Sequence, residues 1–268
     1  MNLKTGKDLQ LWTGVFLLAA VFLLMAVFAL VRGVNIEVDL NAALTPPSYH
    51  LLGTDDLGRD ILSCLVYGAG ISLAIGLSVV LLSVSTGTLL GMVSGLAGGT
   101  TDILIMRIVD IILAFPGILL AIALVSLFRQ GIVTLILVLS FSGWVGYARI
   151  VRAEVLKYKQ KEFILAARSY NASFTRIIFS HLLPIVRPLV VVQASLDISG
   201  VILAESSLNF LGIGLDSEIP TLGQLIDAGR VHIFDDPQRL FIPGLVLFSI
   251  IIAFNFIGEG LRKKFTKG

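Results

Sequence analysis

The stretch between Asp60 and Asp102 contains no charged side chain. It is far longer than the roughly 20 residues that a helix needs to cross about 30 Å of hydrocarbon. A soluble fold would have to cover this stretch with polar surface, and the composition offers too little, because 56% of the residues are hydrophobic and 14% are charged. We therefore expect an integral membrane protein. Its continuous apolar runs predict an all-α protein rather than a membrane barrel, whose strands alternate over about 10 residues.

Six apolar segments have the length and composition of transmembrane helices. They cover approximately residues 11–31, 69–97, 103–128, 132–150, 185–204 and 241–258. The first segment is longer than the apolar core of a signal peptide, so it is interpreted as a retained helix. The chain is thus predicted to be polytopic, with a first helix and an external segment in residues 1–68, a transmembrane domain in residues 69–262 and a cytoplasmic tail in residues 263–268.

Lysine and arginine are unevenly distributed between the segments that join these helices. If the N-terminus is cytoplasmic, fourteen of the 20 basic residues face the cytoplasm, whereas five lie outside and Arg107 lies within a span. Cytoplasmic segments of membrane proteins carry an excess of Lys and Arg. The distribution therefore predicts a multi-pass protein with both termini in the cytoplasm. The net charge of +2 is too small to suggest a nucleic-acid partner.

The long cytoplasmic segment, residues 151–184, is amphipathic. Phe163, Ala166 and Ala167 lie among charged side chains such as Glu162, which predicts short helices at the membrane face. A helix that presents small alanines with a charged rim can enter a shallow groove on a partner protein, because small side chains let backbones approach closely. The same pattern would also suit an interfacial helix held by anionic lipid.

This segment resembles a known motif. Ala166 and Ala167, followed by Asn171 and later by Leu183-Pro184, are similar to the Glu-Ala-Ala loop of bacterial ABC importer permeases. In that family the loop forms a coupling helix that sits in a groove of the ATPase subunit. Leu165 stands where the family has Glu, and Asn171 stands where Gly is usual. Asn tolerates the left-handed backbone conformation that a glycine would supply, so the turn is expected to persist.

The resemblance covers residues 50–262 and points to the branch of the family that transports peptides and nickel. The residues that carry it, in order, are His50-Leu51-Leu52-Gly53-Thr54-Asp55, Gly58-Arg59-Asp60, Arg107 with Asp110, Phe115-Pro116, Trp144 with Ala148-Arg149, Ala204-Glu205, Phe210-Leu211-Gly212, Pro243-Gly244, and Phe254-Asn255 with Gly258 and Leu261-Arg262. The family's acidic-proline ending is missing, and Lys263-Lys264-Phe265 stands there instead, which puts only the terminal contacts in doubt.

The resemblance implies the type I permease fold and a place in the bacterial inner (cytoplasmic) membrane. It implies three kinds of partner besides the lipid bilayer: a second homologous permease, two cytoplasmic ATPase subunits and an external substrate-binding protein. ATP and Mg are expected on the ATPases, because the chain has no G-x-x-x-x-G-K-[ST] phosphate loop. We therefore expect no catalytic residue and no cofactor in this chain. The implied cargo is a dipeptide or oligopeptide, with nickel or a metal chelate as the alternative.

The residues implied to couple the permease to its ATPase are Glu162, Ala166, Ala167, Asn171, His181, Leu183 and Pro184.

Two other classes of membrane protein would also fit a polytopic chain. A secondary transporter usually contains inverted repeats around a midplane site, and no convincing repeat relates residues 1–134 to residues 135–268. An intramembrane hydrolase is disfavoured because G-x-S-x-G and H-E-x-x-H are absent from the sequence.

Arg107, Asp110, Asp197 and Glu205 are the charged residues that we consider as candidates for positions within the membrane. Arg107 and Asp110 are three residues apart, so we expect a structural ion pair that offsets a burial cost of about 2.5–3.5 kcal/mol each. Asp197 and Glu205 lie about 80° apart around one helix, and either is a candidate for an aqueous pathway. Helix packing or a contact with a partner subunit would explain Glu205 equally well.

The histidine and cysteine residues of the sequence do not have the spacing that would predict a metal site. His181 lies beside the end of the coupling segment, where a capping or interface role is expected. His50 and His232 lie outside the membrane, and neither has the additional ligands at short spacing that a metal ion needs. The single cysteine, Cys64, cannot form an internal disulfide.

Overall fold

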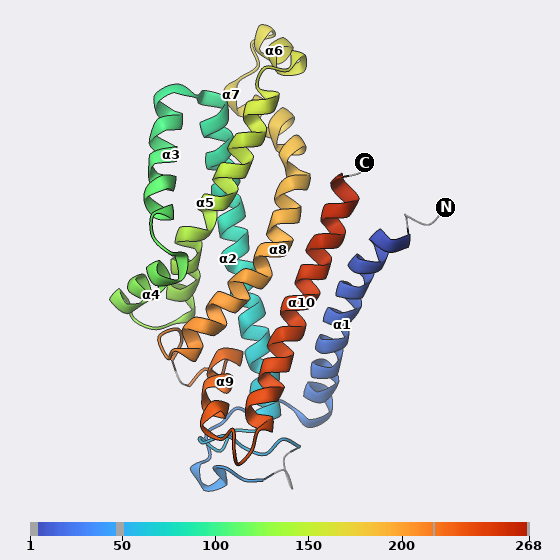
Figure 1. Ribbon diagram of the computed structural model, residues 1–268, viewed down its shortest axis with the longest axis vertical. Coiled ribbons are helices and arrows are strands. Elements are labelled where there is room, and N and C mark those ends of the chain that lie inside the picture. Colours follow the sequence, from blue (N-terminus) through green and yellow to red (C-terminus); the bar gives the residue numbers. More distant parts are fainter. Residues whose placement is uncertain (1–4, 47–50, 217, 267–268) are drawn as a thin grey trace.

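The computed structural model describes residues 5–46, 51–216 and 218–266. Within these ranges the regular elements are helices, which confirms the all-α prediction, and an isolated bridge pairs Thr54 with Asp60. The elements shown in Figure 1 are α1 (Thr5–Arg32), the 3₁₀ turn η1 (Leu40–Ala42), α2 (Ile61–Ala97), α3 (Gly99–Leu113), α4 (Gly117–Leu127), α5 (Ile132–Tyr158), α6 (Glu162–Ser169), α7 (Phe174–Arg176), the π-helical turn η2 (Ile177–Leu182), α8 (Leu183–Phe210), α9 (Leu222–Val231) and α10 (Gln238–Thr266).

Five helical segments of the described chain are long and apolar enough to cross a membrane. They are the apolar part of α1, then α2, α5, the continuous segment from α7 through α8, and α10. Helices α3 and α4 pass the same test only together, and they make a sixth crossing if the pair counts as one span. The predicted number of about six transmembrane helices is therefore confirmed.

The third predicted span, residues 103–128, is wrong as a single helix. It is divided between α3 and α4, whose axes are bent by 87°. Pro116 lies at the break, with a ψ angle of 124°. Proline has no N–H for the helical ladder, and its ring disfavours the helical conformation at Phe115. Helix α3 alone, with 15 residues, is about 22 Å long and too short to cross the hydrocarbon.

The structure places residue 68, the end of the predicted N-terminal part, inside α2. The helix begins at Ile61, where the Asp60 carboxylate accepts a hydrogen bond from the Ser63 backbone N–H at 2.8 Å. An acidic side chain in this capping position satisfies a donor that the first helical turn leaves free. Along the chain, the segment between Arg32 and Ile61 therefore connects the N-terminal helix α1 to α2.

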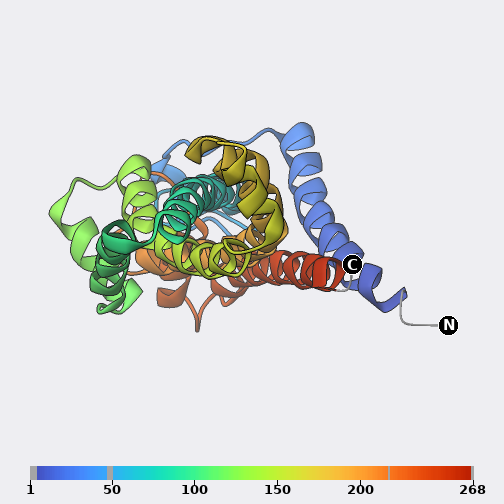
Figure 2. The ribbon, with the colours of Figure 1, turned by 90° about the horizontal axis from the view of Figure 1, so that it is seen from above.

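Helix α2 occupies the centre of the bundle, as Figures 1 and 2 show together. It contacts α1, α3, α5, α8, α9 and α10. Helix α1 lies at the periphery and packs mainly along α10. The start of α1, the end of α10 and the short helix α6 lie toward one end of the molecule, whereas α9 and the segment before α2 lie at the other end.

Three glycines at four-residue intervals bring α2 against α5. A Cβ atom at Gly91 would lie 2.6 Å from the carbonyl oxygen of Ala148, and one at Gly95 would lie 2.8 Å from the Cβ of Val155. At Gly87 the nearest atom, a backbone oxygen, would be 2.3 Å away. Small residues at this spacing allow close helix contact in membranes, where packing rather than hydrophobic burial holds helices together. The two backbones therefore touch without intervening side chains.

Replacing Gly91 by leucine is expected to separate α2 from α5 and to destabilise the protein by about 1–3 kcal/mol, because the side chain would meet backbone atoms that cannot move aside. Thermal unfolding of the detergent-purified chain measures the effect. Gly70→Leu in the same helix is the control, since a Cβ at Gly70 meets nothing within 4 Å. Equal unfolding temperatures for the two variants would contradict this account of the α2–α5 contact.

Candidate functional site

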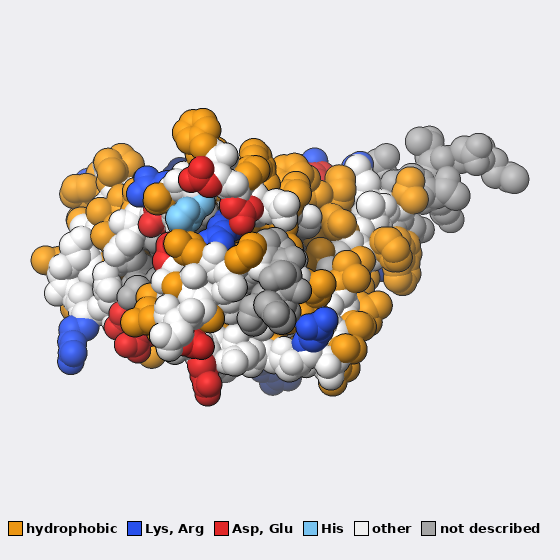
Figure 3. All heavy atoms as spheres, turned by 90° about the horizontal axis from the view of Figure 1, so that it is seen from below, with side chains coloured by type: hydrophobic (Ala, Val, Ile, Leu, Met, Phe, Trp, Pro, Cys, Tyr) orange, Lys and Arg blue, Asp and Glu red, His pale blue; other side chains and the backbone are white. Residues whose placement is uncertain are grey.

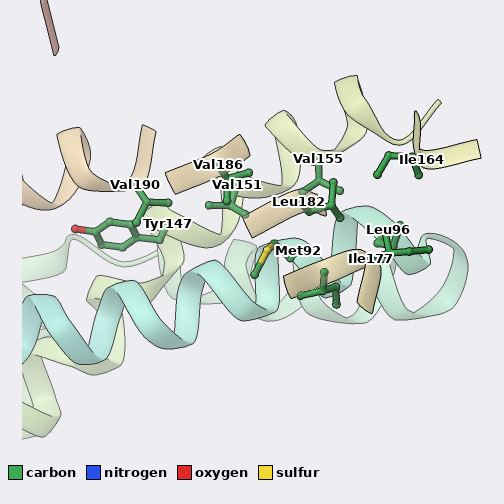
Figure 4. Packing of buried hydrophobic residues seen from close by; sticks show 11 residues of the cluster. Met92, Leu96, Tyr147, Val151, Val155, Ile164, Ile177, Leu182, Val186 and Val190 are labelled. Carbon is green, nitrogen blue, oxygen red and sulfur yellow. The ribbon is translucent and has the colours of Figure 1, made fainter. Parts of the chain in front are cut away.

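The coupling segment contains short helices, as predicted, but it begins later than residue 151. Helix α5 continues to Tyr158 because Val151 and Val155 are fully buried on its inner face. Helix α6 then projects beyond the bundle (Figure 1), held by Ile164, whose side chain is also fully buried. Figure 4 shows Ile164 in a cluster with Val155 and Leu182. The buried side chain of Ile164 therefore attaches α6 to α5 and η2.

The end of α6 has the left-handed turn that the sequence predicts at Asn171. This residue has a φ of +52°, in the left-handed region. The N–H of Ala172 donates to the carbonyl of Ala167 at 2.9 Å, and the N–H of Asn171 donates to the carbonyl of Arg168 at 2.9 Å. This pair of bonds is the Schellman motif, which usually has glycine in the left-handed position. Asn171 thus closes the helix where the family has glycine.

The outer surface of α6 is apolar. Ala166 is exposed and Ala167 is half-buried. Exposed aromatic and aliphatic side chains surround them, namely Phe163, Leu165, Tyr170 and Phe174. Glu162, at the start of the helix, and Arg168, near its end, are exposed charged residues at the border of this surface. A contiguous apolar surface with a charged border is typical of a protein-binding site.

The remaining residues of the coupling segment lie where η2 joins α8. Leu183 is half-buried, and its N–H donates to the carbonyl of Ile178, five residues earlier. Pro184 follows in the first turn of α8, where the absence of an N–H is tolerated. The backbone hydrogen bonds of η2 span five residues instead of four, because Pro184 has no N–H to donate to an ordinary α-helical bond. His181 is half-buried in η2, and no hydrogen bond of its side chain is found in the described structure.

The predicted ion pair between Arg107 and Asp110 is not formed. Both residues are exposed on α3, and no salt bridge joins them in the described part of the chain. The acid of this hairpin that does pair is Asp102, which receives two bonds from the Arg152 guanidinium at 2.5 and 2.6 Å and also contacts the Ser94 hydroxyl. Local spacing did not indicate this pair, because its two residues are 50 positions apart.

Asp197 and Glu205 lie in different surroundings. Asp197 lines a cavity of about 440 Å³ between α2, α4, α5 and α8, and it accepts a hydrogen bond from the Gln193 side chain at 2.9 Å. Glu205 is fully buried and does not line this cavity. The geometry thus separates the two carboxylates that the sequence left as alternatives, with Asp197 as the candidate for a pathway.

Glu205 belongs to a network that holds the loop after α8. The Asn209 side-chain amide donates to its carboxylate at 2.5 Å, and the Ser206 hydroxyl donates at 3.2 Å. The Asn209 amide oxygen in turn accepts the N–H of Leu215 at 2.7 Å. The loop then leads into α9, where Gly223 packs directly on the backbone of Ser206. Glu205 therefore has a packing role, which was one of its two predicted roles.

The end of the molecule opposite α6 carries most of the acidic side chains. Figure 3 shows this face, with acidic, basic and histidine side chains close together. Arg59 pairs with Asp55 at 2.8 Å, and the His232 ring contacts Asp56 at 3.0 Å. A cavity of about 560 Å³ lies beside them, lined also by Asp216. His50 lies outside the described residues, within which no three His, Cys, Asp or Glu side chains are placed to hold a metal ion.

The fold and these sites together define a polytopic membrane permease. Residues 87–267 match the family described as binding-protein-dependent transport system inner membrane component. The chain belongs to this family. It is 41% identical over 223 residues to the oligopeptide transport system permease protein OppC of Haemophilus influenzae, an alignment that covers 83% of this chain and 72% of the relative.

Two further relatives define the branch. The chain is 37% identical over 233 residues to the dipeptide transport system permease protein DppC of Haemophilus influenzae, with 84% of this chain and 79% of the relative covered. It is also 37% identical over 219 residues to the nickel transport system permease protein NikC of Escherichia coli K12, with 82% and 79% covered. The chain is therefore an ABC importer permease of the peptide and nickel branch, and its transport system includes a binding protein and an ATPase.

Replacing Asn209 by alanine is expected to lower the free energy of unfolding by about 2–4 kcal/mol, because a buried carboxylate loses a donor and the Leu215 N–H loses its acceptor. Thermal unfolding in detergent measures the loss, and protease digestion should cut the segment after α8 sooner. Asn255→Ala is the control, since the exposed Asn255 amide donates only within its own helix. An unchanged unfolding temperature for Asn209→Ala would contradict the network.

Proposed function

We propose that this chain is one of two permease subunits that import small peptides after delivery by an external binding protein, driven by two cytoplasmic ATPase subunits. The observation that carries the proposal is α6. This helix presents exposed apolar side chains beyond the end of the bundle, and the buried side chain of Ile164 fixes it to the core. A helix that transmits force needs both properties: an exposed face for its partner and a rigid attachment to the part that moves.

The proposed cargo is a dipeptide or an oligopeptide. Relatives whose names refer to oligopeptide and dipeptide transport support this choice. Nickel or a nickel chelate is the second candidate, and it is favoured by the similarity to the nickel permease. Asp197 is the single carboxylate that lines the cavity between α2, α4, α5 and α8, whereas a bare divalent cation prefers several oxygen or imidazole ligands. The lining therefore suits an organic cargo better.

The proposed orientation places α6 and both termini in the cytoplasm and α9 outside. The basic residues support this orientation, because Lys157, Lys159 and Arg168 lie at the α6 end, whereas Asp56 and Asp235 lie at the other end. In this orientation the acidic face of Figure 3 meets the external binding protein.

Cysteine labelling in intact cells tests the orientation. In a background in which the buried Cys64 is replaced by alanine, Asp235→Cys is expected to react with a membrane-impermeant maleimide, whereas Gln160→Cys is expected to react only after the cells are opened. Both positions are exposed, so differences in local burial do not decide the result. Labelling of position 160 but not position 235 in intact cells would reverse the proposed orientation.

Replacing Ala166 by arginine tests the coupling helix. The longer side chain is expected to overfill a groove on the ATPase and to weaken its association with the permease about tenfold or more, equivalent to about 1.4 kcal/mol. Ala166 is exposed, so the permease itself should fold and insert as before. The measurement is the amount of ATPase that co-purifies with the permease from detergent.

The matched control is Gln160→Arg, which adds the same charge at an exposed position just before α6. A helix that rests on anionic lipid would gain affinity from either substitution, at about 1 kcal/mol per basic residue. A partner groove should reject only the arginine at position 166. Equal ATPase recovery and equal transport in the two variants would show that α6 does not occupy such a groove.

A further inference from the structure

We propose that the cavity around Asp197 is a binding site within the membrane for the ammonium group of the transported peptide. This inference rests on the proposed function in peptide import. It adds a chemical role for particular side chains of the permease, in addition to whatever selection the external binding protein makes.

The cavity lies about halfway along the bundle. Its walls include Val80 and Ser83, near the middle of α2, and Asp197 and Gly200, near the middle of α8. Its volume of about 440 Å³ is within the range of pockets that bind small organic molecules, about 300–1,000 Å³. The bend at Pro116 contributes a wall, since it turns the first residues of α4 toward the cavity.

Hydrogen-bond acceptors gather on one side of the cavity. The Asp197 carboxylate accepts one bond, from the Gln193 amide at 2.9 Å, and the Gln193 amide oxygen accepts none in the described structure. Tyr147 of α5 also lines the cavity, but its hydroxyl is buried and has no hydrogen-bond partner within the described residues. Figure 4 shows this hydroxyl at the edge of the buried cluster, pointing away from the other labelled side chains.

The charge of the cavity selects a cation. Asp197 is its one ionisable acid, and neither lysine nor arginine lines it in the described chain. A carboxylate within the membrane is costly unless a positive group accompanies it. A primary ammonium has three N–H donors, which match the two oxygens of the Asp197 carboxylate and the Gln193 amide oxygen.

The space beside these acceptors is open. A Cβ atom at Gly117, Gly146 or Gly200, all of which line the cavity, would meet nothing within 4 Å. In contrast, the glycines of α2 that face α5 have no such room. The peptide beyond its amino group can therefore occupy the region that these three glycines leave free, where the lining offers little to distinguish one side chain from another.

The experiment uses the complete transport complex, purified with its second permease and its ATPases, without the binding protein. Equilibrium dialysis measures the binding of alanyl-phenylalanine and of its N-acetylated form to the wild-type complex and to Asp197→Asn. Asp197→Asn is expected to weaken binding of the free-amine dipeptide at least tenfold and to leave binding of the acetylated dipeptide unchanged. The wild type should also bind the acetylated form at least tenfold more weakly than the free form.

Further variants separate binding from folding. Asp197→Glu keeps the charge and should keep the preference for the free amine, and Asp235→Asn, in an exposed external turn, should bind like the wild type. An equal loss for both dipeptides in Asp197→Asn, an unchanged affinity in that variant, or no measurable binding to the wild type at millimolar dipeptide would each overturn the inference.

Uptake into vesicles that also contain the binding protein distinguishes this failure from failure of the proposed function. If the wild-type complex takes up dipeptides while Asp197→Asn shows no selective loss, the ammonium site is wrong and peptide import stands. If the wild type takes up a nickel chelate but no dipeptide, the proposed function is wrong, and the ammonium site fails with it.

Discussion

The direct backbone contact between α2 and α5 is the interaction on which the rest of the structure depends. Lipid offers no hydrophobic force to bring two helices together, so the contact relies on close packing at Gly87, Gly91 and Gly95. Toward one end of this contact, α5 extends beyond the bundle and carries α6. Toward the other end, the same two helices form walls of the Asp197 cavity. The coupling surface and the candidate pathway are therefore positioned by one helix pair.

Tyr147 connects these two regions. Its side chain belongs to the buried cluster that also contains Ile164 of α6, and the residue also lines the cavity. Packed interiors contain few voids, so a displacement of α6 must be absorbed within this cluster or passed along it. The cluster includes Val155, Leu182 and Val186, which lie between the two ends. The contacts are contiguous from the surface proposed for the ATPase to the acceptors proposed for the cargo.

Sequence patterns predicted the number of membrane crossings, the short helices after α5 and the left-handed turn at Asn171. Each of these depends on local composition or on the backbone preference of one residue. The 87° bend was missed because hydropathy measures how apolar a segment is, and α3 and α4 are as apolar together as one straight span. The Arg107–Asp110 pair was predicted from spacing alone, which places two residues on one helix face without showing what that face meets. The Asp102–Arg152 pair depends on tertiary packing across 50 residues.

Helix α2 is longer than the bilayer that it crosses. Its 37 residues span about 55 Å, whereas a bilayer with its headgroups is about 40–45 Å thick, and an average tilt of about 20° shortens the vertical reach only to about 52 Å. The helix thus exceeds the bilayer by roughly one to two turns. Near its start it packs against the segment before α9, where a Cβ atom at Gly68 would lie 3.1 Å from the backbone of Thr221. The end of the molecule that carries α9 is therefore built on the same continuous helix as the bundle, so a tilt of α2 would displace both.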